Sequence, residues 1–241
     1  EIPKRDWSSD VCSSDLNQIQ NINPEELRKM TKETNIQFTM HMPDEADPGS
    51  FYESVREGYV SLFSDTLDWA HEAGIKLLNM HIIEGAKMTL PDKIVYIYDQ
   101  YSNQYQHSFV ESIKELSSKA ESFGITIAIE NSHNFGQKYI QQVLDKAIRY
   151  PNIKLTWDTG HDAKSKFTDK EYLMKNRDKI VHMHLHDAIG NKDHQIPFDG
   201  ELNIEELITF AKQQDITMLI EVKTAAALRK SVRILREKKL I

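Results

Sequence analysis

Six residues of types that bind metal ions or transfer protons stand at intervals along the chain, each at the end of an apolar segment. Glu130 follows the run ITIAI, and Glu221 follows the run TMLI. A carboxylate behind such a run must be paired or bound to a metal, because burying an unpaired charge is costly. In chain order the six residues are His41, His81, Glu130, Asp158, His184 and Glu221.

Four of these six form a set that packing alone explains poorly, since it holds one histidine and three carboxylates. Carboxylate oxygens together with one imidazole suit a hard or borderline divalent ion such as Mn²⁺, Mg²⁺, Co²⁺ or Zn²⁺. The sequence therefore predicts one site for such an ion. Its predicted ligands are Glu130, Asp158, His184 and Glu221.

Further histidines lie near these positions, although a single histidine at a strand end is more often a hydrogen-bonded core residue than a ligand. His161 follows Asp158 by three residues in WDTGH. His182, His184 and His186 alternate and therefore share one face of their strand, so we expect His186 to lie behind the ligands and His182 to pack deeper. The candidates for substrate binding or for additional metal are His41, His81, His161, His186, Asp193 and His194.

The apolar segments that end in these residues alternate with amphipathic segments of helical period. Mostly apolar strands separated by helices predict an α/β protein with a parallel sheet. In an open doubly wound sheet, ligands gather at one switch point, whereas in a closed barrel the carboxyl ends of all strands converge. Six ligand-type residues at six strand ends therefore favour a TIM (β/α)8-type barrel. The expected strands are 36–42, 76–83, 125–130, 153–157, 180–186 and 217–222, and the expected helices are 24–34, 54–73, 107–123, 137–149, 169–176, 203–213 and 225–238, with a long polar loop over 84–104.

Composition excludes several other classes of protein. The 241 residues hold 30 basic and 37 acidic side chains, a net charge of −7, which argues against affinity based on neutralising phosphates. No apolar run approaches the ~20 residues of a bilayer span. A single cysteine excludes an internal disulfide framework, and no glycine-rich phosphate loop is present.

The segment 6–16, DWSSDVCSSDL, has neither helical nor strand periodicity and no apolar core of a signal peptide. It matches the in-frame translation of a common sequencing adapter, so we interpret residues 1–16 as a non-native leader and residues 17–241 as the folded domain. Without Asp6, Asp10 and Asp15 the net charge becomes −7 + 3 = −4. Cys12, the single cysteine, also falls within this leader.

With these residues in place, the chain resembles the xylose-isomerase-like TIM barrel superfamily, which includes sugar isomerases, sugar epimerases and the endonuclease IV family (AP endonuclease family 2). The resemblance covers about residues 17–241. It implies that the strand ending in HMP is the third of the barrel, so that strands three to eight are present and the first two are missing. We therefore expect an incomplete, N-terminally truncated barrel with an exposed edge. The motifs are HMP at 41–43, His81, IEN at 129–131, WDTGH at 157–161, HLHD at 184–187, GELNI at 200–204 and IEV at 220–222.

The resemblance to ketose epimerases implies an enzyme that moves a proton on a small sugar or sugar phosphate through an enediolate stabilised by the metal. Glu130 and Glu221 would serve as acid and base, and His161 would hold a substrate hydroxyl. The loop over 84–104, with its tyrosines at 96, 98 and 101, would either cover the sugar or form a plain surface insertion. One departure leaves the substrate open: no arginine follows HLHD, and Lys192 is a poorer bidentate partner.

Two alternatives remain. An endonuclease IV-like phosphodiesterase acting on abasic DNA would use three Zn²⁺ ions, with His41, His81, His161 and the pair Asp193 and His194 as extra ligands. The acidic net charge argues against nucleic acid as a partner. The second alternative is an inactive fragment. We expect a cytoplasmic protein with no membrane partner, and the oligomeric state stays open, a homo-oligomer included.

Overall fold

The computed structural model describes residues 8–11 and 22–241, and its centre is one curled parallel sheet of seven strands. Every pairing in this sheet is parallel, as the alternation of strands and helices predicts. The sheet curls until its end strands, β1 and β11, approach one another. In spatial order the strands are β1 (Ser8–Val11), β2 (Gln37–His41), β3 (Leu77–His81), β6 (Thr126–Glu130), β7 (Ile153–Asp158), β8 (Ile180–Leu185) and β11 (Thr217–Ile220).

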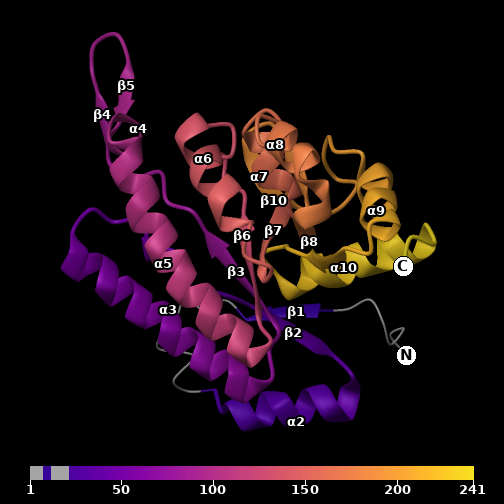
Figure 1. Cartoon of the computed structure of the whole chain (residues 1–241). Helices are drawn as coiled ribbons and strands as arrows, with labels where there is room; N and C mark the ends of the chain where they lie inside the picture. The colour runs from indigo at the N-terminus through magenta and orange to yellow at the C-terminus, as the bar shows by residue number, and fades with distance from the viewer. Residues whose placement is uncertain (1–7, 12–21) are drawn as a thin grey trace.

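Helices cover the outer face of the curled sheet, with α3 and α5 side by side at one edge and α9 and α10 on the opposite side (Figure 1). Alternate residues of a strand face opposite sides, so Ile127 and Ile129 of β6 face the helices while Glu130 faces the interior of the curl. The described helices are α2 (Pro24–Thr34), α3 (Glu53–Ala73), α4 (Ile97–Gln100), α5 (Ser102–Phe123), α6 (Lys138–Ala147), α7 (Thr159–Lys164), α8 (Lys170–Lys175), α9 (Ile204–Gln213) and α10 (Ala225–Glu237).

The long helix α5 shows why these amphipathic segments pack as they do. Its buried residues recur three or four positions apart and form one apolar stripe, which includes Phe109, Ile113 and Leu116. Each such side chain contributes roughly 1.5–3 kcal/mol when fully buried. The helix ends at Gly124, which takes the left-handed conformation (φ 60°) that closes a helix most easily without a Cβ.

The strands and helices expected from the sequence are confirmed to within a few residues, but three polar stretches hold structure that was not expected. The stretch 84–104 is a hairpin of β4 (Lys87–Thr89) and β5 (Ile94–Tyr96) followed by α4 and the start of α5, so the expectation of a loop was wrong. A second hairpin, β9 (Asp187–Ile189) with β10 (Lys192–Gln195), follows β8, and α7 follows β7. Exposed hairpins carry little apolar periodicity, so the pattern that reveals core strands does not reveal them.

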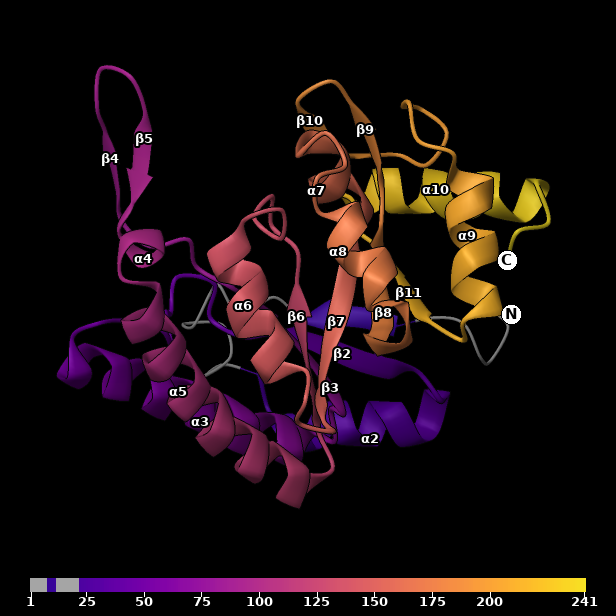
Figure 2. The ribbon, with the colours of Figure 1, turned by 45° about the horizontal axis from the view of Figure 1, so that its top comes forward.

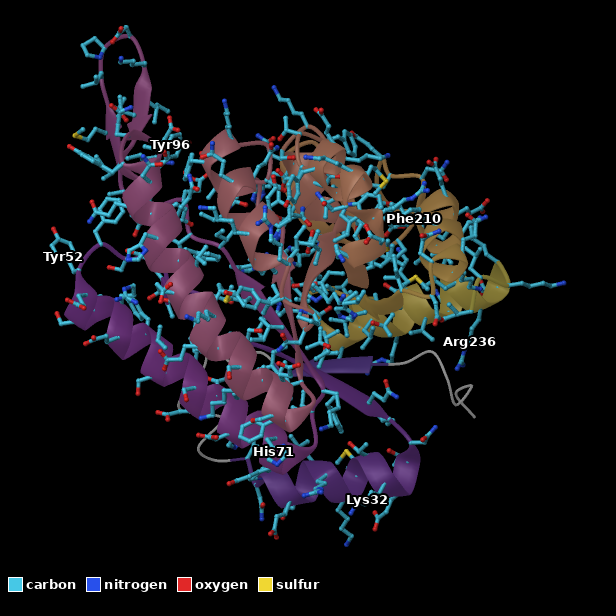
Figure 3. The ribbon with its side chains drawn as sticks, viewed as in Figure 1. Lys32, Tyr52, His71, Tyr96, Phe210 and Arg236 are labelled. Atoms are coloured by element: carbon cyan, nitrogen blue, oxygen red, sulfur yellow. The ribbon has the colours of Figure 1, made fainter. Side chains whose placement is uncertain are left out.

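Both hairpins rise from the side of the sheet where the strands end, as Figure 2 shows. Figure 3 places Tyr96 on the first hairpin and Tyr52 before α3, away from α9 and α10. Of the three tyrosines noted in this stretch, Tyr98 is buried, stacks on Tyr105 and donates a hydrogen bond to Asp47 Oδ2 at 2.5 Å. Tyr98 therefore secures the base of the hairpin.

The seventh strand corrects the expectation of six. Ser8–Val11 lies within the segment interpreted as a leader, yet it pairs with β2 along Gln37–Met40. Parallel pairing uses backbone groups, so a segment without apolar periodicity can occupy the open edge of β2. The remaining residues of that segment lie outside the described part of the chain, and its origin stays a prediction.

No helix among the described residues is long and apolar enough to span a bilayer.

Candidate functional site

Glu130 occupies the centre of the site, at the carboxyl end of β6. Its carboxylate is buried and faces histidines from three other strands. Glu130 Oε2 lies 3.2 Å from His41 Nε2, and Oε1 lies 3.4 Å from His81 Nε2 and 3.2 Å from His184 Nδ1. These residues are far apart in the chain and meet because parallel strands end on one side of the sheet.

Asp158, the last residue of β7, is held from two directions. Its Oδ1 accepts the backbone N–H of His161 at 2.6 Å, which caps the first turn of α7. Its Oδ2 accepts a hydrogen bond from His186 Nε2 at 2.9 Å and lies 3.6 Å from His161 Nδ1. The motif WDTGH therefore aims one carboxylate oxygen into the interior, next to the ring of His161.

Glu221 directly follows β11 and lies against two histidines. Its Oε2 is 3.1 Å from His184 Nδ1, and its Oε1 is 3.2 Å from His194 Nε2. The ring of His194 stacks on that of His186, with centroids 4.4 Å apart, and its Nδ1 lies 2.9 Å from Asp193 Oδ1. The second hairpin thus brings His194 to the rim of the site.

The histidines keep the carboxylates ionised. Burial works to raise the pKa of Glu130, but His184, His41 and His81 hold that pKa well below its usual range. Burial likewise acts to raise the pKa of Glu221, and hydrogen bonds from His184 and His194 lower it overall. The hydrogen bond with Glu221 is the main cause that raises the pKa of His194 to about 9. At neutral pH the site therefore holds ionised carboxylates facing imidazole nitrogens.

The residues present fit a divalent cation. One ligand atom from each member of the predicted set can be chosen so that all four lie within 4.8 Å of one another. Glu130 Oε2 and Glu221 Oε2 are buried atoms that face His41 Nε2 at 3.2 Å and His184 Nδ1 at 3.1 Å, without the alignment of a full hydrogen bond. Buried oxygens in that condition fit a cation as their partner. The set is Glu130, Asp158, His184 and Glu221.

Four more groupings surround this set, and one of them adds a residue that the sequence reasoning missed. Asp44 Oδ1 lies 3.5 Å from both His41 Nδ1 and His81 Nδ1. Asp44 directly follows HMP, in a polar loop. Nothing in the sequence therefore indicated that its side chain would face these histidines. The four groupings are His41 with Asp44 and His81, His41 with Glu130 and His184, His81 with Glu130 and His161, and His186 with His194 and Glu221.

Not every predicted residue enters a common site. Asp193 binds Lys164 Nζ at 3.1 Å and also contacts His194 Nδ1. Among the described residues, no grouping of possible metal ligands contains both Asp193 and His161. Lys192, which could have replaced a substrate-binding arginine, is exposed on β10. The third zinc site of an endonuclease IV-type enzyme is therefore not assembled among the residues described.

A layer of buried polar residues lies beneath the ligands and was also missed, apart from His182. Asn79 stands two residues before His81, and Thr156 two before Asp158, so each faces the interior. The spacing of two residues from a predicted ligand was the signal in the sequence that could have revealed both residues. It was overlooked because Asn79 and Thr156 are neutral, and the cost of burying a charge identifies only ionisable residues.

Three comparisons place this geometry among known proteins. The uncharacterized protein MJ1614 of Methanocaldococcus jannaschii is 26% identical over 216 residues, which is 88% of this chain and 79% of that protein. A D-tagatose 3-epimerase-like protein superposes with a TM-score of 0.78 at 22% identity, over 95% of this chain and 87% of its own. The IOLI protein, whose structure has a binding zinc atom, superposes with a TM-score of 0.69 at 15% identity, over 97% of this chain and 86% of its own.

The family model described as xylose isomerase-like TIM barrel matches residues 5–238, nearly the whole chain. Its match agrees with the parallel sheet, with the helices outside it and with the clustering of ligand-type residues where the strands end. The chain belongs to the xylose isomerase-like TIM barrel family.

Proposed function

We propose that the chain is a divalent-metal-dependent sugar isomerase or epimerase. The observation that carries this proposal is the group of one histidine and three carboxylates, all buried except the half-buried Glu221, whose ligand atoms lie within 4.8 Å of one another. Similarity to a D-tagatose 3-epimerase-like protein and to a protein with a binding zinc atom supports the substrate class and the metal. The proposed ligands are Glu130, Asp158, His184 and Glu221.

The chain's own carboxylates supply the proton transfer. Glu130 and Glu221 are both held ionised by their histidines, so each can accept a proton from a carbon next to a sugar carbonyl. Glu221 is 33% exposed, whereas Glu130 is buried. A substrate between them would meet one carboxylate on each side. His161 lies beside Glu130 and Asp158 and can hold a substrate hydroxyl.

A bound divalent ion would hold two neighbouring sugar oxygens and withdraw negative charge from them. The donor atoms identify this ion only as a hard or borderline divalent cation. We propose one ion per chain, with His186 and His194 as outer partners of Asp158 and Glu221.

The second candidate is a zinc phosphodiesterase of the endonuclease IV type. The observation in its favour is that His41 and His81 both face Glu130, which allows a second ion beside the first. Against it stands the position of Asp193, which pairs with Lys164 rather than with His161.

One set of measurements separates these candidates. The metal content of the purified protein is determined, and the protein is then assayed for solvent deuterium incorporation on a panel of ketoses and for cleavage of abasic DNA. We expect about one divalent ion per chain and deuterium incorporation at C2 or C3 of one ketose. About three zinc ions together with strand cleavage would favour the second candidate, and metal binding with neither activity would overturn both.

A further inference from the structure

A pocket of about 220 Å³ lies on the helix side of β7, between the segment that joins α7 to α8 and the start of α9. Alternate residues of a strand face opposite sides, so Trp157 faces this pocket while Asp158 faces the interior with the proposed metal ligands. The pocket is therefore separate from the proposed active site. It is smaller than the roughly 300–1,000 Å³ of pockets that hold drug-sized ligands, so it suits a small molecule.

Three aromatic rings line this pocket. The buried Trp157 meets Phe210 of α9, which Figure 3 labels, with ring centroids 5.4 Å apart and an angle of 82° between the rings. The third ring, Phe167, is 50% exposed. Such rings offer an apolar surface, and their faces carry the negative end of a quadrupole that attracts cations.

The backbone at Phe167 is unusual. Lys166 and Phe167 have φ angles of 58° and 62°, in the left-handed region that favours glycine. Hydrogen bonds from Lys166 N–H to Ala163 O at 2.9 Å and from Phe167 N–H to Asp162 O at 2.8 Å hold this conformation. A half-exposed ring gains little from burial, so packing alone does not explain a phenylalanine here. Backbone strain of this kind clusters where a chain holds a side chain ready for a ligand.

The charges around the pocket select the class of ligand. Of the described residues that line it, one is basic, Lys170, and three are acidic. The acidic residues are Asp162, Glu201 and Glu206. Even if Asp162 is counted as neutral, the two glutamates outweigh the one lysine. Glu206 Oε2 accepts a hydrogen bond from Asn203 Nδ2 at 3.1 Å, and this neutral amide does not cancel the charge.

We propose that this pocket binds a small organic cation, an ammonium group on a short aromatic or apolar body. The body would lie against the aromatic rings, and the ammonium would face Glu201 and Glu206. Lys170 does not serve as its partner, because the Lys170 ammonium has the same charge and lies 5.9 Å from the centroid of the Trp157 ring. Binding here requires neither a metal nor a sugar, so the inference is independent of the proposed function.

Three probes of similar shape separate the effect of charge from that of size. They are 2-phenylethylammonium, the neutral 2-phenylethanol and the anionic 3-phenylpropanoate. Each is titrated near neutral pH while the indole N–H signals of the tryptophans are followed by NMR, and Trp157→Phe assigns the signal of Trp157. This N–H donates to Asp162 Oδ2 at 3.2 Å, at the wall of the pocket, so its signal reports an occupant.

We expect the ammonium probe to shift the Trp157 signal and to bind about 5-fold or more tightly than the alcohol, with the carboxylate weakest. Removing both charges with Glu201→Gln and Glu206→Gln together should weaken the ammonium probe about 5- to 10-fold and leave the alcohol unchanged. Glutamine keeps the shape of both side chains. Phe167→Ala removes one wall of the pocket and should weaken both probes about 3- to 10-fold.

The control is Glu205→Gln, since Glu205 lies on the same turn of α9 but pairs with Lys238 at 3.5 Å outside the pocket. It should bind every probe as the parent protein does. Thermal unfolding checks that the variants fold, and if Phe167→Ala does not, the double glutamine variant decides.

Three results would overturn the inference. The first is no binding, or a Trp157 signal that none of the probes moves. The second is equal affinity for the three probes, or tighter binding of the carboxylate. The third is a loss of affinity in Glu205→Gln as large as in the double variant. Solvent deuterium exchange on ketoses is measured separately, so its failure would overturn the proposed function and leave this pocket untouched.

Discussion

His186 Nε2 donates a hydrogen bond to Asp158 Oδ2 over 2.9 Å, and both side chains are fully buried. The second ring nitrogen of His186 accepts the backbone N–H of His194 at 2.8 Å, which leaves the ring proton on Nε2. His186 is therefore a donor toward Asp158. Such a partner fixes the orientation of a ligand before any metal binds.

Room for the His186 ring depends on Gly160. A Cβ at Gly160 would overlap the His186 ring, so Gly160→Ala must displace His186 or α7. We expect a loss of about 1–3 kcal/mol in the free energy of unfolding and about 10-fold weaker metal binding. Urea unfolding and zinc competition measure the two effects.

The control for this substitution is Gly58→Ala. Gly58 is exposed within α3, and a Cβ there would meet nothing within 4 Å. Removing a glycine from a helix interior should stabilise the protein by about 0.5–1 kcal/mol. If Gly160→Ala is as harmless as Gly58→Ala, the close approach of Gly160 to His186 does not matter for the site.

Glu221→Gln tests the acid and base role. Glutamine keeps the shape but cannot accept the substrate proton, so we expect solvent deuterium exchange to fall about 10²- to 10⁴-fold. Circular dichroism should show an intact fold, because Glu221 lies at the open end of β11. The control is Glu201→Gln, an exposed carboxylate on the neighbouring loop, which should keep the parent rate. Full exchange by the Glu221 variant would remove this residue from the proton transfer.

Asp187→Asn tests the loop that follows the second hairpin. The buried Asp187 carboxylate accepts four backbone N–H groups, from Ala188, Phe198, Gly200 and Leu202, at 2.8–3.0 Å. Asparagine offers one acceptor oxygen, so some of these groups lose their partner at about 1–3 kcal/mol each. We expect the unfolding midpoint in urea to fall, whereas Asp178→Asn, at an exposed position, should leave it unchanged.

Asp162→Asn tests a buried carboxyl outside the site. Burial, and then the neighbouring Asp169, raise the pKa of Asp162 from 3.8 to about 7. The folded protein therefore binds more protons than the unfolded chain between these values, and this carboxyl makes stability fall as pH rises from about 4 to 7. The contribution to the slope is at most about 1.4 kcal/mol per pH unit.

Asparagine cannot ionise, so Asp162→Asn should gain stability relative to the parent protein as pH rises through that window. Below about pH 4 the two proteins should differ by an amount that no longer depends on pH. Parallel pH profiles for parent and variant would show that Asp162 does not titrate there.

The sequence was sufficient to predict the parts of the fold and site whose residues would be costly to place elsewhere, such as apolar strands and charged side chains next to them. Glu130 and Glu221 stand behind apolar runs, and a carboxylate in such a place needs a partner. Asn79 and Thr156 occupy equivalent inward positions, but neutral polar groups find partners in many settings, so their roles depend on contacts that only the fold reveals. The hairpin β4–β5 was missed because its polar, exposed strands lack the alternation of a buried sheet.

Every pairing in the large sheet joins strands that lie far apart in the chain, as where Leu77 pairs with both Thr39 and Thr126. In kinetic terms the sheet has no local hairpin from which to start, and parallel pairings of this kind form slowly. The ligand group also draws on a long stretch of the chain, from Glu130 to Glu221. While the chain grows on the ribosome, the carboxylates of the site therefore lack their full set of partners. They stay in that condition until the last strand has emerged.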